Sequence, residues 1–222
     1  MGDMGDKFLS NCPIFQMLPE TEFKRIEEAA KERSFLPGEV IFKEGERAHH
    51  VWIVKKGWVR LVKQNSHRHP RTIFVLTPAE VFCGISALDH GSYSATGVAA
   101  ADSILLQIPV ECFDALLERS PLFVRKLLKV CCDRIRHMAE AYSLSQAPVE
   151  TRIVHVLSQL QKDFGPILPF THREIAEMAG TTVETSIRTL SRLKKKGCVR
   201  SSRGKIVLLQ PKKSLPFKNK VA

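Results

Sequence analysis

The spacing of apolar residues changes near Pro121, and this change constrains the fold more than any other feature of the sequence. Between Phe35 and about Ile108, short β-branched and aromatic runs alternate with Gly, Pro and Asp turn signals, a pattern typical of an antiparallel sandwich or barrel. After Pro121, apolar residues recur alternately every four and three positions, as in a helix with a heptad seam. The clearest apolar runs are 39–43, 51–54, 58–63, 72–76 and 103–108, with a short packing helix expected at 20–31.

A single long helix is expected from residue 121 to about 147, where Ala147-Pro148 breaks the helix and provides a hinge. Off-seam charges such as Arg125, Lys129 and Arg136 favour a two-stranded dimer helix. The alternative is a helix packed on its own domain, because apolar stripes of this length are common in globular cores. The predicted dimer interface comprises Val124, Leu128, Cys131, Ile135, Met138 and Tyr142.

Beyond an amphipathic helix at 151–162, two short helices joined by Gly180 are predicted. Thr171-His172-Arg173-Glu174 and Thr181-Thr182-Val183-Glu184 each match a capping box, in which a threonine hydroxyl and a glutamate satisfy free N–H groups at a helix start. Two short helices around a glycine turn are the helix-turn-helix signature. The predicted inner faces are Ile175, Ala176 and Ala179 in the first helix and Val183, Ile187, Leu190 and Leu193 in the second.

Positive charge is concentrated in the same segment. Residues 171–222 contain thirteen Lys or Arg against three Glu, which is +10 of the total net charge of +11. This asymmetry indicates a polyanionic partner for one end of the chain, because Lys and Arg contacts to phosphate supply most non-specific nucleic-acid affinity. A solvated basic tail is the simpler interpretation for Lys212, Lys213, Lys218 and Lys220.

The second short helix has an outer face suited to reading base edges. A guanidinium such as Arg188 bonds guanine O6 and N7, and a carboxylate such as Glu184 accepts from cytosine N4. The alternatives are that Glu184 only caps the helix and that Arg188 only meets phosphate. Downstream, 198–201 and 205–209 around Ser202-Arg203-Gly204 predict a β-hairpin wing with phosphate contacts. The predicted DNA-binding residues are Thr181, Thr182, Glu184, Thr185, Arg188, Arg192, Lys195, Arg200, Arg203 and Lys205.

Other function classes find little support. The six cysteines lack the spacing of a zinc or iron–sulfur site and indicate reduced thiols in a cytoplasmic protein. We expect neither a signal peptide nor a membrane span. We also expect no enzyme, because no Gly-x-Ser-x-Gly, phosphate-binding loop or His-Glu-x-x-His motif fits the predicted elements. A regulatory module that binds a ligand and a protein partner instead of DNA is the remaining alternative.

These segments together resemble the CRP/FNR family of bacterial transcription regulators over nearly the whole chain. Residues 37–46 and 51–60 look like the opening strands of its cyclic-nucleotide-binding-type jelly roll. The resemblance implies an α+β fold with a sensor domain at 1–120, a dimerisation helix and hinge at 121–147, and a winged helix-turn-helix at 148–222. It also implies a homodimer on a palindromic double-stranded DNA site related to TTGAT or TGTGA, and RNA polymerase as a partner.

The resemblance also places an effector pocket, but the residues depart from those of nucleotide binders. Gly84 or Ile85 stands where the family has a glutamate, Tyr93-Ser94-Ala95 replaces Arg-Ser-Ala, and His137-Met138 replaces a Thr-Ser pair. We therefore expect an effector other than cyclic AMP. Haem, with Cys83, His137 or Met138 as ligand, and thiol oxidation at Cys131 are minority alternatives. The predicted pocket comprises Gly84, Ile85, Ser86, Tyr93, Ser94, His137 and Met138.

Overall fold

The computed structural model describes residues 8–16, 18–64 and 70–209, without the side chains of Ile85 and Ala87. Its chain forms two compact units, Met1–Ala139 and Glu140–Ala222. The four lysines of the predicted basic tail lie outside the described residues. Within the described part of the chain, no helix is long and apolar enough to cross a membrane.

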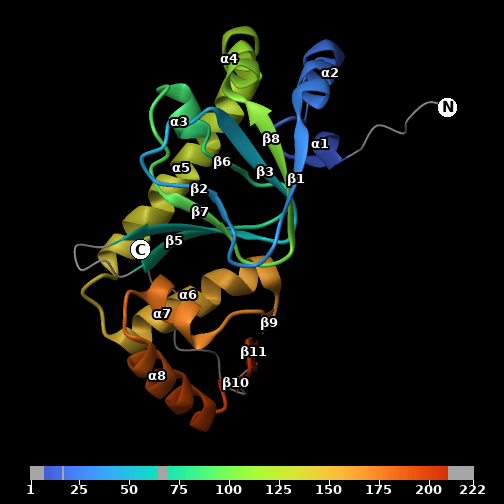
Figure 1. Ribbon diagram of the computed structural model, residues 1–222. Coiled ribbons are helices and arrows are strands. Elements are labelled where there is room, and N and C mark those ends of the chain that lie inside the picture. The colour runs from blue at the N-terminus through green and yellow to red at the C-terminus, as the bar shows by residue number, and fades with distance from the viewer. Residues whose placement is uncertain (1–7, 17, 65–69, 210–222) are drawn as a thin grey trace, which may run out of the picture. The chain divides into compact units, whose positions relative to one another are not determined.

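The N-terminal unit is built on two four-stranded antiparallel sheets, which confirms the predicted sandwich (Figure 1). One sheet has the strand order β1-β8-β3-β6 and the other β2-β7-β4-β5. The strands are β1 (Lys31–Phe35), β2 (Val40–Phe42), β3 (His50–Lys56), β4 (Val59–Gln64), β5 (Pro70–Leu76), β6 (Val81–Phe82), β7 (Thr96–Ala99) and β8 (Ser103–Pro109). The five apolar runs correspond to β2, β3, β4, β5 and β8.

Strand β1 was not expected, because its sequence Lys-Glu-Arg-Ser-Phe is largely polar and exposed. Within the described residues it pairs with β8 alone and forms one edge of its sheet. An edge strand is partly open to solvent, so it can fold without alternating large apolar residues. The helix expected at 20–31 therefore ends at Ala29, and Lys31 begins β1.

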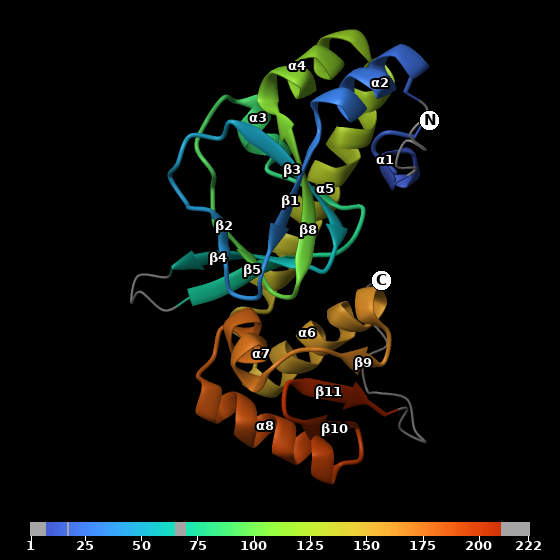
Figure 2. The ribbon, with the colours of Figure 1, turned by 45° about the vertical axis from the view of Figure 1, so that its right-hand side comes forward.

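Five helices accompany the sandwich within the described residues. They are α1 (Phe8–Asn11), α2 (Glu20–Ala29), α3 (Gly84–Leu88), α4 (Val110–Arg119) and α5 (Pro121–Ser143). Helices α2 and α4 contact each other at one end of the sandwich (Figure 2). Phe123 and Leu127 of α5 are buried in a core shared with Phe15, Phe113 and both sheet and helix residues. The spacing of apolar residues predicted neither α3 nor α4.

The long helix α5 has a second apolar face that its own unit leaves exposed. Leu128 is 55% exposed, Ile135 65% and Tyr142 81%, and Met138 is also exposed, whereas Val124 and Cys131 are half-buried. Burial of α5 therefore depends on Phe123 and Leu127, with Cys131 of the predicted seam packed against the same core, whereas the other large apolar seam residues stay exposed. The helix ends at Ser143, earlier than predicted, and turns at 144–146 lead to Pro148.

Up to residue 209, the C-terminal unit contains three helices and a three-stranded antiparallel sheet of order β10-β11-β9 (Figure 2). Its elements are α6 (Val149–Phe164), β9 (Ile167–Leu168), α7 (His172–Ala179), α8 (Val183–Lys195), β10 (Val199–Ser202) and β11 (Lys205–Leu208). Ser202 pairs with Lys205 across the Arg203-Gly204 turn, which confirms the hairpin wing. Strand β9, two residues long, was not expected.

Glycine is required at the β3–β4 turn for two separate reasons. Gly57 has φ +78°, and a Cβ atom there would lie 2.6 Å from the Asp102 carbonyl oxygen and 2.9 Å from Ser103 Cα. Gly45 also has a positive φ, +85°, but a Cβ atom there would meet nothing within 4 Å. A side chain at Gly45 would therefore meet backbone strain alone, whereas a side chain at Gly57 would meet both backbone strain and steric overlap.

We expect Gly57→Ala to lower the free energy of unfolding by about 2 to 5 kcal/mol, since left-handed backbone strain and overpacking both act there. Gly45→Ala, as the matched control, should lose only the strain, about 1 to 2 kcal/mol. Urea titration of the N-terminal unit, followed by tryptophan fluorescence, measures both. Equal losses in the two variants would contradict the steric argument.

Candidate nucleic-acid interface

Helix α7 begins with the capping box that the sequence predicts. The Glu174 backbone N–H donates to Thr171 Oγ1 over 3.2 Å, and the Thr171 backbone N–H donates to a Glu174 carboxylate oxygen over 2.8 Å. The helix ends at Gly180, whose φ of 61° and ψ of 49° place it in the left-handed region. Ile175, Ala176 and Ala179 are buried, as expected.

The second capping box is predicted one residue too early. The Thr181 backbone N–H donates to the Ala176 carbonyl, so Thr181 completes the exit from α7 rather than starting α8. Thr182 is the N-cap residue, and its hydroxyl accepts from the Thr185 backbone N–H over 3.2 Å. Since the cap lies at Thr182, the helix begins at Val183.

The inner face of α8 also differs from the prediction. Leu190 and Leu193 are buried, but the other two buried positions are Ser186 and Thr189, and Ile187 is exposed. These four buried residues recur at intervals of three and four, so they form one helical face. Small hydroxyl side chains allow α8 to approach α6 and α7 closely, which an isoleucine pointing inward would prevent.

The opposite face of α8 carries the predicted base-reading residues. Glu184 and Arg188 are exposed and lie one helical turn apart. Hydrogen bonds from its own backbone N–H and from the Thr182 hydroxyl lower the pKa of Glu184, so the side chain is a carboxylate acceptor at neutral pH. Arg188 Nη2 donates to Thr185 Oγ1 over 3.2 Å, which restrains the guanidinium along the helix.

The remaining predicted contacts surround this face. Thr182 and Lys195 are exposed on or next to α8, and Arg200, Arg203 and Lys205 are exposed on the wing. Thr181 and Thr185 are half-buried.

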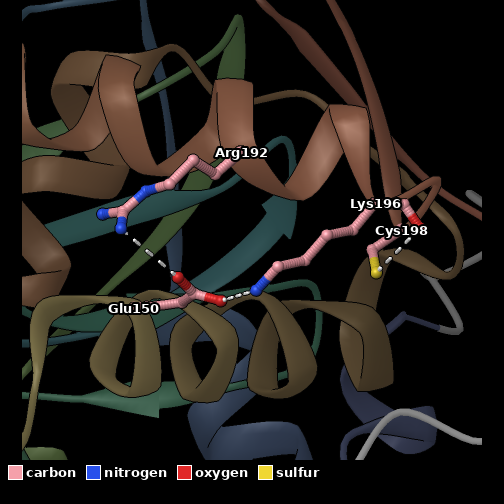
Figure 3. Close-up of polar contacts among 4 residues, drawn as sticks. All are labelled: Glu150, Arg192, Lys196 and Cys198. Carbon is pink, nitrogen blue, oxygen red and sulfur yellow. Dashed lines mark hydrogen bonds and ion pairs between the residues drawn. The ribbon is translucent and has the colours of Figure 1, made fainter.

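Arg192 and Lys196 are held by a carboxylate that the sequence did not single out (Figure 3). Glu150, in the first turn of α6, lies between them: its carboxylate is 2.6 Å from Lys196 Nζ and 3.9 Å from Arg192 Nη1. Glu150 and Lys196 are separated by 46 positions, so no local pattern could reveal the pair. Arg192, predicted to contact DNA, thus already has an anion close by.

Arg152, also in the first turn of α6, supports the turn between α7 and α8. Its Nη1 donates to the carbonyl oxygens of Ala179, over 2.9 Å, and Gly180, over 3.0 Å. Carbonyls at a helix C-terminus carry partial negative charge, which a guanidinium satisfies well. The start of α6 therefore contacts both the turn before α8 and the C-terminal end of α8.

Two residues of the predicted effector pocket contribute to the core of the N-terminal unit instead. Tyr93 is buried, its ring is stacked 4.0 Å from that of Phe42, and its hydroxyl donates to the His50 carbonyl. A Cβ atom on Gly84 would lie 3.4 Å from Leu127 Cδ1 and 3.7 Å from Phe113, so a longer side chain has little room. Neither position presents the arginine or glutamate that would bind a cyclic nucleotide.

The other predicted pocket residues differ in their exposure. Ser86 is buried in α3, while Ser94 and Met138 are exposed. The side chain of Ile85 lies outside the described residues. The His137 ring lies 5.5 Å from that of Phe74, in β5.

Arg134 of α5 reaches the same region, although the sequence marked it only as an off-seam charge. Its guanidinium carbon is 5.7 Å from the centre of the Phe74 ring, and Nη2 donates to the Val81 carbonyl. Burial lowers the pKa of Arg134, an effect that the charge of Glu80 opposes. Arg134 therefore connects α5 to both β5 and β6.

The cysteines are free thiols within the described residues. Burial raises the pKa of Cys83 far above its ordinary range and raises that of Cys12 to about 11. Burial also raises the pKa of Cys131. Because the thiolate is both the nucleophile and the metal-binding form, a raised pKa lowers the fraction of reactive thiolate at these three positions. No group of three or more potential metal ligands occurs in the described part of the chain.

Comparison with known proteins defines the class. The family model of the cyclic nucleotide-binding domain matches residues 32–120, and that of the Crp-like helix-turn-helix domain matches residues 151–213. The chain is 32% identical over 200 residues to the Cyclic AMP receptor protein of Thermus thermophilus, covering 89% of this chain and 93% of that protein. The chain belongs to the CRP/FNR family of DNA-binding transcription regulators.

Solved structures show the same fold. The crystal structure of the Catabolite Activator Protein of Thermus thermophilus is 30% identical with a TM-score of 0.52, covering 90% of this chain and 94% of that chain. The c-di-GMP-responsive global regulator CLP of Xanthomonas campestris has a TM-score of 0.74 at 17% identity, covering 86% and 99%. At that identity, the second similarity concerns the fold alone.

We expect Arg152→Met to destabilise the C-terminal unit by about 2 kcal/mol, since it removes two charge-assisted hydrogen bonds to carbonyls. Hydrogen exchange of residues 172–195 under increasing urea measures this loss. Arg173→Met, which changes an exposed arginine on α7, is the matched control and should remain within about 0.5 kcal/mol. A loss no larger than that of the control would show that Arg152 does not support the turn.

Proposed function

We propose that the protein binds a two-fold palindromic operator with a TGA-type core as a homodimer, under control of an effector sensed by its N-terminal unit. The observation that carries the proposal is the exposed face of α8, on which Glu184 and Arg188 lie one turn apart. The half-site is related to TTGAT or TGTGA. In the family, a glutamate and an arginine at this spacing read such a core.

Arg188 and Glu184 each read a different base. Arg188 bonds the O6 and N7 atoms of a guanine, and Glu184 accepts from the N4 amino group of a cytosine. The lowered pKa of Glu184 supports this role, because a protonated carboxyl would lose acceptor strength. Glu184 also bonds the Thr182 hydroxyl at the helix start, so capping and base reading are compatible.

Phosphate contacts surround this base-reading pair. We assign them to Thr181, Thr182, Thr185 and Lys195 around α8 and to Arg200, Arg203 and Lys205 on the wing. These contacts position the unit on the duplex without reading sequence. Arg192 joins them only if a phosphate displaces Glu150, which lies beside its guanidinium.

The homodimer forms through the exposed face of α5. Its seam combines the exposed Leu128, Ile135, Met138 and Tyr142 with the half-buried Val124 and Cys131, spaced as a heptad repeat. Four large apolar side chains exposed along one helix form a patch that a second copy covers by two-fold symmetry. A symmetric dimer in turn requires a palindromic operator.

The effector of this chain is not cyclic AMP, even though the Thermus thermophilus relative is named a cyclic AMP receptor protein. A buried phosphate needs a cation and N–H donors. At the position of the family arginine, Tyr93 stacks on Phe42, and Gly84 carries no carboxylate. Haem ligation by Cys83 and oxidation of Cys131 are disfavoured by the raised pKa of each thiol.

Transmission to DNA runs along α5 to the Ala147-Pro148 hinge. Rotation there changes the spacing of the two recognition helices relative to successive major grooves. An effector acts only if its affinity differs between the two states. The DNA-bound dimer then recruits or excludes RNA polymerase.

We expect Arg188→Ala to weaken operator binding by about 100-fold or more, because each half-site loses a bidentate contact of about 1 to 3 kcal/mol. Fluorescence anisotropy with an operator selected from random duplexes, and with a scrambled duplex, measures this loss. Lys162→Ala, which removes one exposed charge at the end of α6, is the control. Unchanged operator specificity in Arg188→Ala, or a large effect of added cyclic AMP, would contradict the proposal.

We expect Ile135→Asp to convert the dimer into a monomer, because two carboxylates would face each other across the seam. Sedimentation velocity measures the oligomeric state, and operator affinity should fall in parallel. Lys129→Asp introduces the same charge at an exposed position off the seam and should remain a dimer. A dimeric Ile135→Asp, or a monomeric unaltered protein, would place the interface elsewhere.

A further inference from the structure

The placement of Ile187 reverses the usual pattern of a packed helix. Its side chain is 43% exposed, whereas Ser186 and Thr189, its polar neighbours on α8, are 0% exposed. An amphipathic helix normally buries its large apolar residues and exposes its hydroxyls. Ile187 is not among the buried core residues, and β-branched residues are modest helix formers, so core packing of α8 does not by itself account for an isoleucine here.

The neighbours of Ile187 indicate what it faces. It follows Glu184 by three positions and directly precedes Arg188, both exposed and both assigned to base edges. Val183, half-buried, lies one turn before it. Residues three and four apart share a helical face, so Val183 and Ile187 form an apolar strip beside the polar strip of Glu184 and Arg188.

A major groove offers one apolar group to such a strip, the C5 methyl of thymine. We propose that Ile187 packs against the C5 methyl of a thymine. This thymine lies within about two base pairs of the guanine bound by Arg188, because adjacent helical residues rise by about 1.5 Å and adjacent base pairs by about 3.4 Å. This inference rests on the proposed DNA-reading role of α8. It adds a methyl readout to the two polar contacts.

Replacing thymine by uracil removes this methyl group and nothing else from the duplex. In a palindromic operator selected by the full-length protein, each thymine is replaced in turn, in both half-sites together. At one position affinity should fall about fourfold per half-site, or about fifteenfold for the dimer, as expected for one methyl-sized group. Uracil at the other positions should have little effect.

Protein variants identify the side chain responsible. Ile187→Ala should lower affinity for the thymine operator by a similar factor and should be insensitive to uracil at the critical position. Ile187→Val retains a branched apolar group and should keep part of the sensitivity. Because Ile187 is exposed, both variants should fold normally, which thermal unfolding and unchanged affinity for scrambled duplex verify.

Two results would overturn the inference: no thymine at which uracil weakens binding, or an Ile187→Ala variant with full sensitivity to uracil. The second would mean that another side chain or the shape of the duplex reads the methyl group. If the proposed DNA-reading role of α8 were itself wrong, Arg188→Ala would retain operator specificity. This result distinguishes failure of the DNA-reading role from failure of the methyl contact. Loss of binding in Arg188→Ala together with indifference to uracil would refute the methyl contact alone.

Discussion

The hydrogen bond from the Thr185 backbone N–H to the Thr182 hydroxyl fixes where α8 begins, and the arrangement of the exposed face of α8, our candidate DNA-reading face, depends on it. A helix that began one residue earlier would rotate each outer side chain by about 100 degrees relative to the cap. The first turn of α6 then secures the helix from two directions. Arg152 binds the carbonyls of the preceding turn, and Glu150 binds Lys196 after the last turn. The side chains to which we assign base reading therefore lie on a helix restrained at both ends.

Helix α5 serves two purposes with two faces. Phe123 and Leu127 pack into the core of the N-terminal unit, while the face that includes Ile135 remains exposed, where we propose that a second copy binds. Farther along the helix, Arg134 contacts Phe74 and the Val81 carbonyl. A change in the sheets at Phe74 would thus act on the helix close to the seam. The contact between Arg134 and Phe74 therefore connects the sheets of the N-terminal unit directly to the helix that carries the proposed dimer interface.

The jelly roll also shows how a binding position becomes part of a core. Where the family resemblance places an arginine that would bind phosphate, Tyr93 stacks on Phe42, and its hydroxyl bonds the His50 carbonyl and the Trp52 indole nitrogen. The aromatic ring adds buried apolar area, while the hydroxyl remains satisfied. A fold shared with nucleotide-binding relatives therefore does not imply the same ligand, because function depends on the site rather than on the architecture.

Sequence by itself determined five of the sandwich strands, the long helix, the Thr171 cap, the glycine turns and the helix-turn-helix with its wing. These depend on local periodicity and backbone conformation, which a short window contains. It did not determine strand β1, the burial of Ser186 and Thr189, or the outward direction of Ile187. Nor could it pair Glu150 with Lys196 or place Arg134 beside Phe74. Only the tertiary structure decided these features, because close packing and contacts between distant residues select which face of an element is buried.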